Sequence, residues 1–226
     1  MDLEQARRFR EAACQDRYSA LWHVLLFGGL RPGEAFALRW KDVDTEAGAV
    51  RVVYNLVRIS GVAGWKVLAP KTPGSSRTVP LPRVAMQELG KWKTQQKKDR
   101  LQAVEWEQCQ HDFVFTTLRG TPLHGARRSF ERVMEAAELG KWGPQPKRKS
   151  RSGPAPRRPF KPQFRMYDLR HTMATLLILD EVNLKVVSER LGHKTIAQTA
   201  DRYCHVLPPM QRDAADKLGE MLGGTG

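Results

Sequence analysis

The sequence is poor in cysteine and in long apolar runs. Its 3 cysteines, Cys14, Cys109 and Cys204, form an odd and widely separated set, which predicts neither a disulfide framework nor a zinc site. No apolar run is long enough to cross a bilayer and no secretory signal opens the sequence, so we expect a cytoplasmic protein without a membrane partner. Carboxylates are not clustered as a Mg²⁺ site requires, and no glycine-rich phosphate-binding loop occurs, so we expect neither a metal nor a cofactor.

Acidic residues are also few, because 38 Lys and Arg stand against 24 Asp and Glu, giving a formal net charge of +14. A positive field of this kind steers a protein toward polyanions, and nucleic acid is the first partner to consider. A merely soluble basic protein has the same composition, so composition alone does not decide. At 226 residues the chain is long enough for one large or two small domains with a hydrophobic core.

The segment 166–206 places three reactive side chains near the ends of predicted helices. Asp168 is typical of a helix N-cap, which sets Arg170 in the first turn of the helix that follows. Asn183 opens a second helix, and Gly192 ends it and leaves His193 just beyond it. A third helix carries Tyr203 near its last turn. We therefore expect a guanidinium, an imidazole and a phenol to converge.

A further candidate lies in the segment G-G-L-R-P-G-E-A-F-A-L-R-W-K-D-V-D, residues 28–44. The glycines allow a sharp turn and Pro32 favours the start of a new helix, so Arg31 is presented from a loop. Arg31 then either faces a site or caps the carbonyls of the preceding helix. We favour a site, because Arg170 supplies a second guanidinium. Glu34 is expected to brace a neighbouring backbone or guanidinium.

Between residues 49 and 81 the hydrophobic period changes to two, which predicts a small antiparallel sheet with short strands at 49–54, 56–60, 65–68 and 77–81. Lys71 lies just before the turn at Pro73-Gly74. Basic residues on hairpins ordinarily serve solubility or protect a sheet edge, so spacing alone assigns no role to Lys71.

Amphipathic periodicity predicts further helices at the N-terminus, after Pro82 and before residue 140, and a more apolar run predicts another over residues 18–27 that ends at Gly28-Gly29. The residues expected to face the core from these helices and from 168–191 are Leu3, Ala6, Phe9, Ala13, Phe130, Val133, Met134, Ala137, Leu169, Met173, Leu176, Leu177, Val186, Val187 and Leu191.

Residues 140–166 hold 9 Lys or Arg, 6 Pro and no acidic residue. Too little of this segment is apolar to offset the entropy of ordering, so we expect a loop without fixed structure. Its position before Tyr167 suggests that it follows DNA phosphates, although a passive surface loop has the same composition. The candidate phosphate contacts are Lys147, Arg148, Lys149, Arg151, Arg157, Arg158 and Lys161.

Residues 208–226 form a tail that begins with Pro208-Pro209 and continues as a helix with one apolar stripe. The stripe comprises Met210, Ala214, Leu218 and Met221 or Leu222. A tail of this kind docks either on its own body or on a neighbouring chain, and the sequence leaves both possibilities open.

Taken together, these motifs resemble the tyrosine recombinases, the family of phage and mobile-element integrases and Xer-type resolvases. M-Y-D-L-R-H-T is similar to the family's (His/Tyr)-x-Leu-Arg-His-(Thr/Ser), and Tyr203 follows His193 of L-G-H by the family's 10 residues. G-L-R-P-G-E is similar to Gly-x-Arg-x-x-Glu, and K-T-P-G-S-S-R-T-V-P-L to the hairpin of the family's lysine. The resemblance spans nearly the whole chain but covers only the catalytic domain, and the helical core-binding domain that usually precedes it is expected to be absent.

The resemblance implies an α+β fold over residues 1–226, mostly helical with a small three-stranded antiparallel sheet, with 140–166 as an insertion. It also implies metal-free transesterification, in which Tyr203 forms a 3′-phosphotyrosyl bond and frees a 5′ hydroxyl. Arg31 and Arg170 match the phosphorane oxygens, because a guanidinium presents a planar fork of donors. His193 is a further donor, and Lys71 protonates the leaving oxygen.

Tyr167 departs from the commoner pattern of the family, in which a histidine precedes the second arginine by three residues. A phenol with a pKa near 10 is a poor proton acceptor at neutral pH, so Tyr167 is expected to orient the phosphate or Tyr203. Glu34, Asp168 and His171 are expected to support the catalytic residues.

The expected partner is double-stranded DNA. The resemblance implies a monomer in isolation and a homo-tetramer on DNA that exchanges C-terminal helices, encoded by a phage or mobile element in a bacterial cell. Two alternatives remain open. One is a type IB topoisomerase-like enzyme or a hairpin-telomere resolvase, which shares this chemistry, and the other is a non-catalytic DNA-binding regulatory relic.

Overall fold

The computed structural model of the chain describes residues 1–59, 64–69, 76–107, 111–146, 158–203 and 210–223. Its helices are α1 Leu3–Ala13, α2 Ser19–Gly28, α3 Pro32–Phe36, η1 Trp40–Asp42, α4 Arg83–Gln102, α5 Arg127–Ala136, α6 Asp168–Leu179, α7 Leu184–Leu191, α8 Ile196–Tyr203 and α9 Met210–Met221. Its strands are β1 Val43–Asp44, β2 Ala49–Val52, β3 Asn55–Arg58, β4 Trp65–Leu68, β5 Arg77–Pro80, β6 Gly140–Trp142 and β7 Phe160–Pro162. The expected α+β class is confirmed.

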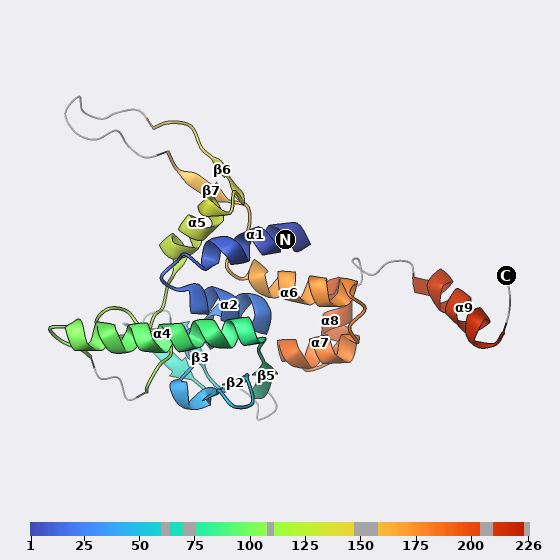
Figure 1. Cartoon of the computed structure of the whole chain (residues 1–226), viewed down its shortest axis with the longest axis horizontal. Helices are drawn as coiled ribbons and strands as arrows, with labels where there is room; N and C mark the ends of the chain where they lie inside the picture. The colour runs from blue at the N-terminus through green and yellow to red at the C-terminus, as the bar shows by residue number, and fades with distance from the viewer. Residues whose placement is uncertain (60–63, 70–75, 108–110, 147–157, 204–209, 224–226) are drawn as a thin grey trace.

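Helix α2 lies at the centre of the fold and packs against both α4, which runs beside it in Figure 1, and α6. Its sequence is apolar on all sides, which is typical of a fully buried helix, and Leu21, Trp22 and Val24 are inaccessible to solvent. It ends at Gly29 in the left-handed conformation (φ 61°). A Cβ at Gly29 would also lie 2.0 Å from the side chain of Met173 on α6, so the turn requires glycine. This turn carries the chain directly to Arg31.

The three-stranded sheet has the order β1-β2-β5, with Val50 paired to both Val43 and Val79. Strands were expected at β2, β3, β4 and β5 and are found there, but β3 and β4 pair only with each other. The third strand of the sheet is instead β1, which precedes the expected region. The side chain of Asp44 accepts hydrogen bonds from the next backbone amides and, with Gly48 (φ 62°), turns the chain back onto β1.

Helices α6, α7 and α8 build a second, smaller core around Met173, Val187 and Leu191. Asn183 caps α7 and Gly192 ends it in the left-handed conformation (φ 66°), as predicted. The ring of Tyr203 is part of this core and only 3% of its surface is exposed. The packing of this core therefore holds the ring of Tyr203, the nucleophile candidate, in a fixed position.

The expectation of an unstructured loop over 140–166 is wrong at both ends of that segment. Strands β6 and β7 form a two-stranded ribbon that projects from the body in Figure 1. The ring of Trp142 meets Phe160 edge-on at 5.3 Å, and a Cβ at Gly140 would lie 2.3 Å from Phe160. These aromatic residues supply the apolar surface that the charge count concealed. Residues 147–157 lie outside the described part of the chain.

Most residues expected in the core are buried, Leu176 and Leu177 are half-buried, and two are exposed. Leu3 is 52% exposed and Val186 is 52% exposed, so these assignments are wrong. Both lie on an open groove between α1, α2, α6 and α7. On α9, which stands apart from the body in Figure 1, Leu218 and Met221 are 56% and 83% exposed, and Leu222, just after the helix, is 79% exposed. In the described ranges, no helix combines the length and the apolar character needed to span a membrane.

Candidate active site

Arg31 sits at the start of α3, at the mouth of the site, and is held by Glu34. The Glu34 carboxylate accepts from the backbone amide of Arg31 at 2.8 Å and from its guanidinium at 2.7 Å. The same carboxylate accepts hydrogen bonds from both terminal nitrogens of Arg77 on β5, at 3.2 and 2.8 Å. The prediction that Glu34 braces a backbone and a guanidinium is confirmed, and the alternative that Arg31 caps α2 is not what the structure contains.

Burial alone would raise the pKa of Glu34, but the hydrogen bonds and charge of Arg77, together with Arg31, lower it to about 2. A depressed carboxyl pKa stabilises the fold fully above the ordinary value of 4.5 and loses that stabilisation as the pH falls toward 2. The upper limit of this contribution is about 3 kcal/mol.

We expect Glu34→Gln to destabilise the protein at pH 6 by about 3–5 kcal/mol, because Arg77 would remain buried without its charge partner. The difference from the parent should shrink between pH 4.5 and pH 2, where Glu34 itself becomes protonated. Urea unfolding at several pH values measures this. Glu46→Gln, at an exposed position, is the control, and a difference that stays constant with pH would contradict the assignment.

Arg170 is 1% exposed and anchors the second wall of the site. Its guanidinium donates to the Gly29 carbonyl at 2.7 Å and to the Leu191 carbonyl at 2.6 Å, the ends of α2 and α7. Burial, and then the charge of Arg31, lower the pKa of Arg170 to about 10, so it remains charged at neutral pH. Arg170 thus ties two helix ends together while it adds positive charge to the site.

His193 lies between Arg170 and Thr199 on α8. Its Nε2 is 3.2 Å from the Arg170 guanidinium and its Nδ1 is 2.8 Å from the Thr199 hydroxyl. Burial, and then the charges of Arg170 and Arg31, lower the pKa of His193 to about 4, so the ring is neutral at pH 7. A guanidinium only donates, so Nε2 must accept and Nδ1 must carry the proton. At rest, His193 orients Arg170 and is not yet a donor toward a phosphate.

Tyr203 meets His171 rather than the arginines. The phenol oxygen is 2.8 Å from Nδ1 of His171, and the Tyr167 ring stands edge-on to the same imidazole at 5.1 Å. Burial raises the pKa of Tyr203. In the resting protein the phenol is therefore protonated and held inside the fold.

An open pocket of about 600 Å³ joins these groups on the surface. It is lined by Arg31, Tyr167, His193, Gln198, Asp201 and Arg202. The buried Arg170 contacts the pocket residue His193, and the buried Tyr203 contacts His171, whose ring packs on the pocket residue Tyr167. A tetrahedral anion entering here would meet guanidiniums from α3 and α8, with the nucleophile candidate behind them.

Two sets of predicted residues are placed differently or fall outside the described residues. Asp168 is the first residue of α6 rather than its N-cap, and its carboxylate accepts from the Arg165 amide at 2.8 Å. Asp168 therefore closes the turn that precedes α6. Lys71 lies outside the described residues, as do the basic residues of 147–157. Of the basic set, Arg158 and Lys161 are described and exposed.

Two residues that support the site were missed from the sequence. Arg77 also donates from Nε to the Arg190 carbonyl at 2.9 Å, so it links β5 to both α3 and α7. Thr199 is fully buried, and its hydroxyl accepts the hydrogen bond from Nδ1 of His193. Arg77 follows Lys71 by six residues in the quoted motif, and that fixed position was the available signal. Thr199 gave none, because its partner is known only from the packing of α8.

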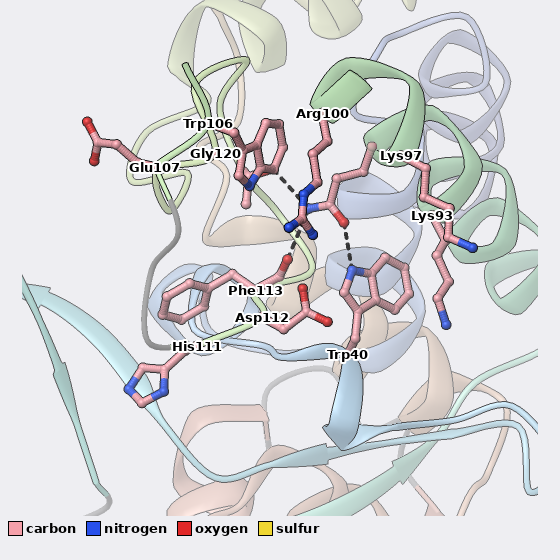
Figure 2. A pocket seen from close by; sticks show the side chains of 12 residues that line it. Trp40, Lys93, Lys97, Arg100, Trp106, Glu107, His111, Asp112, Phe113 and Gly120 are labelled. Carbon is pink, nitrogen blue, oxygen red and sulfur yellow. Dashed lines mark hydrogen bonds between the residues drawn. The ribbon is translucent and has the colours of Figure 1, made fainter. Parts of the chain in front are cut away.

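A second pocket, of about 410 Å³, lies beside α4 and contains none of the predicted catalytic residues. In Figure 2 the indoles of Trp40 and Trp106 face it, with Lys93 and Lys97 projecting from α4 at its side. The Trp40 indole donates to the Gln96 side chain at 2.7 Å, and the Gln96 amide donates to the Phe113 carbonyl. These polar groups satisfy one another's hydrogen bonds, so we do not assign the active site to this pocket. The described residues also hold no group of three His, Cys, Asp or Glu side chains placed to bind a metal ion.

Sequence comparison places the chain among known families. The family model described as "Phage integrase family" matches residues 1–209. The chain is 30% identical to a "Tyrosine recombinase XerC-like" protein of Caldanaerobacter subterraneus subsp. tengcongensis, over 97% of this chain and 53% of the relative. It is 28% identical to the "ICEBs1 integrase" of Bacillus subtilis, over 97% of this chain and 54% of the relative. The chain thus spans about half the length of these relatives.

Solved structures share the fold at lower identity. The Tn1549 transposon integrase in complex with transposon right end DNA superposes with a TM-score of 0.72 at 22% identity, covering 98% of this chain and 65% of that one. The catalytic domain of bacteriophage HP1 integrase gives a TM-score of 0.55 at 19% identity, covering 100% of this chain and 98% of that one. The second match shows that the fold of this chain corresponds to a catalytic domain of this type.

Proposed function

This chain belongs to the phage integrase family of tyrosine recombinases, and on that premise we propose that it cleaves and rejoins double-stranded DNA through a bond between Tyr203 and a DNA phosphate. One observation carries the proposal. Arg31 and His193 line one pocket, the buried Arg170 contacts His193, and the buried Tyr203 contacts His171, whose ring packs on the pocket residue Tyr167. The names of the relatives, recombinase and integrase, support the same activity.

The proposed chemistry follows from the charges of these groups. The Tyr203 oxygen attacks the phosphorus, a covalent 3′-phosphotyrosyl ester forms, and the 5′ oxygen leaves. Negative charge develops on the non-bridging oxygens, where Arg31 and Arg170 stabilise it. Lys71 is proposed to protonate the leaving oxygen. Because the ester keeps the energy of the phosphodiester, a 5′ hydroxyl of another strand reverses the reaction and completes strand exchange.

Covalent trapping tests this function without knowledge of the target sequence. The probe is a pool of nicked duplexes with a randomised central region, in which cleavage releases a short fragment that carries the freed 5′ hydroxyl, so the strand cannot rejoin. A protein–DNA adduct that survives denaturation is the expected result, and sequencing of the adducts identifies a preferred site. A parent chain that binds the pool but yields no adduct would contradict the proposal and favour a non-catalytic DNA-binding relic.

Covalent trapping does not distinguish a recombinase from a topoisomerase-like enzyme or a telomere resolvase, because all three form the adduct. Their reaction products distinguish them. A topoisomerase relaxes supercoiled DNA by rejoining the same strand, and a telomere resolvase makes hairpin ends, whereas a recombinase joins strands from two duplexes. We propose strand exchange, because the matched relatives carry recombinase and integrase names. Those relatives are bacterial, which supports a mobile-element protein acting on DNA in the cytoplasm of a bacterial cell.

We propose that the basic segment within 140–166 contacts DNA phosphates, on the evidence of its sequence. Replacing Lys147, Arg148, Lys149 and Arg151 with serine should reduce the slope of log affinity against log salt by about 0.9 for each lost phosphate contact. Binding to a random-sequence duplex measures the slope. The control removes the same charge from α4, by serine at Lys93, Lys97, Lys98 and Arg100. If both sets of substitutions changed the salt slope equally, the segment would contribute only its net charge and no specific phosphate contacts.

We also propose that copies of this chain assemble on DNA as a tetramer by exchanging α9. The groove between α1, α2, α6 and α7 has a volume of about 550 Å³ and a mostly apolar lining that includes Leu3, Met173 and Val186. Arg7, Arg10 and Arg190 stand on the groove, and α9 carries Asp216 and Glu220 beside its exposed apolar stripe. The two surfaces match in polarity and charge. Lys217 of α9 forms an ion pair of 3.7 Å with Glu181, which precedes the groove residue Val182, so α9 lies near one end of the groove.

The exchange predicts complementation between two defective chains. Leu222→Glu damages the tail and Val186→Glu damages the groove, so each variant alone should fail to assemble beyond a monomer on its DNA site. An equimolar mixture should regain a dimer, because one intact tail then meets one intact groove. Sedimentation of the protein–DNA complexes measures this, with Leu101→Glu as the exposed-leucine control. A mixture that stays monomeric would favour docking of α9 on its own body.

A further inference from the structure

His171 is placed to act on the nucleophile candidate directly. It follows Arg170 on α6 and contacts Tyr203 of α8. Its Nδ1 is 2.8 Å from the Tyr203 oxygen, and the two rings lie 5.8 Å apart. Within the described part of the chain, the imidazole is the recorded hydrogen-bond partner of the phenol, whose residue is only 3% exposed.

The protonation states give this contact a direction. Burial raises the pKa of Tyr203, so the phenol keeps its proton at neutral pH and must lose it before it attacks phosphorus. Burial also lowers the pKa of His171, so its imidazole is uncharged and able to accept. The phenol therefore donates to Nδ1 at rest, which is the arrangement of an acid and its base.

The groups around His171 keep it available for this role. On and before α6, Asp168 favours the protonated imidazole, while Arg165 and Arg170 oppose it. From α8, Arg202 opposes it as well. The edge-on Tyr167 ring, 5.1 Å away, packs against the imidazole. Tyr167 occupies the family's usual histidine position and is itself a poor base, so its contact with His171 gives it a positioning role instead.

We propose that His171 is a catalytic residue that accepts the phenolic proton of Tyr203 as the phosphotyrosyl bond forms. The inference rests on the proposed function. In the step, the Tyr203 O–H bond breaks and its proton moves to Nδ1, giving an imidazolium. The phenolate oxygen forms the bond to phosphorus, and the bond from phosphorus to the 5′ oxygen breaks, with a proton supplied to that oxygen by Lys71. In the reverse step the imidazolium returns its proton to the departing phenolate.

The test is single-turnover cleavage of the trapped DNA site by the parent, His171→Gln and His171→Asn, from pH 5 to pH 9. Gln and Asn keep a hydrogen-bonding group but accept no proton. We expect both to lose about 10²–10⁴-fold in rate at neutral pH, the range for a general base, with DNA affinity unchanged. The parent rate should fall below the lowered pKa of His171 and level off above it. The variants should lack this acid limb. The exposed His124→Gln is the control.

A second substrate separates His171 from Lys71. Sulfur in place of the 5′ bridging oxygen leaves as a thiolate and needs no proton. On this substrate Lys71→Ala should recover most of its rate, whereas His171→Gln should remain slow, because the phenol still has to lose its proton.

Several results would overturn the inference. One is a His171→Gln cleavage rate equal to the parent's, or faster, which would mean that the hydrogen bond only restrains Tyr203. Another is a slow variant whose rate still falls at low pH as the parent's does. If the variants unfold, the parent still decides, because its acid limb must coincide with the His171 pKa measured by NMR. Absence of any adduct from the parent would instead contradict the proposed function.

Discussion

Tyr203→Phe is expected to remove covalent attachment to DNA completely. The substitution keeps the ring, which packs in the small core with Met173, Val187 and Leu191, but removes the attacking oxygen. Adduct yield should fall below detection, at least about 10⁴-fold or about 5.5 kcal/mol of barrier, while DNA affinity is retained. Stability should fall by only about 1–3 kcal/mol, because His171 loses its partner.

The chain has 4 tyrosines, so a full set of phenylalanine variants is small. Tyr18→Phe and Tyr54→Phe are the controls and should form adduct at the parent rate. Tyr167→Phe should still form adduct, more slowly, because its ring packs on His171 and lines the pocket. Any adduct from Tyr203→Phe, located by mass spectrometry on another residue, would refute the assignment of the nucleophile.

Arg170→Lys is expected to lose about 10²–10³-fold in cleavage although the charge is kept. A lysine ammonium lacks the planar fork, so it does not reach the Gly29 and Leu191 carbonyls and His193 together. Because buried carbonyls would lose their donors, the melting temperature should fall too. Single-turnover cleavage and thermal unfolding measure the two effects.

Two comparisons separate the electrostatic loss from the structural one. Arg128→Lys, at an exposed position on α5, should behave as the parent in both assays. A DNA with a methylphosphonate at the scissile position lacks one charged oxygen, so the deficit of Arg170→Lys should shrink on it. A deficit of the same size on both substrates would mean that Arg170 serves only to hold α2 and α7.

Local sequence patterns predicted the helix ends that shape the site. Gly29 and Gly192 were placed correctly because a left-handed residue at a helix end strongly favours glycine, whatever surrounds it. Asn183 was placed correctly as a cap, because its side chain bonds an amide two residues away. Asp168 was not, because its carboxylate reaches back to the Arg165 amide, and residue type alone does not distinguish the two directions.

Amphipathic periodicity assigned Leu3 and Val186 to the core, and it did so for a physical reason that still holds. The pattern reports that a surface is apolar, but not which molecule covers it. In this chain both side chains border an open groove, so they are apolar, as the pattern indicates, but no described part of the same chain covers them. The exposed stripe on α9 has the same cause.

The sequence by itself determined the family, the order of the candidate catalytic residues and the helix ends that carry them, because these depend on residue types at short and fixed spacings. The tertiary structure alone decided which side chains meet. Glu34 and Arg77 are separated by 43 residues, Tyr203 and His171 by 32, and Arg170 and Gly29 by 141. Contacts across such distances arise only when α3 meets β5 and α2, α6, α7 and α8 pack together, and that packing is set by the shapes of many side chains at once.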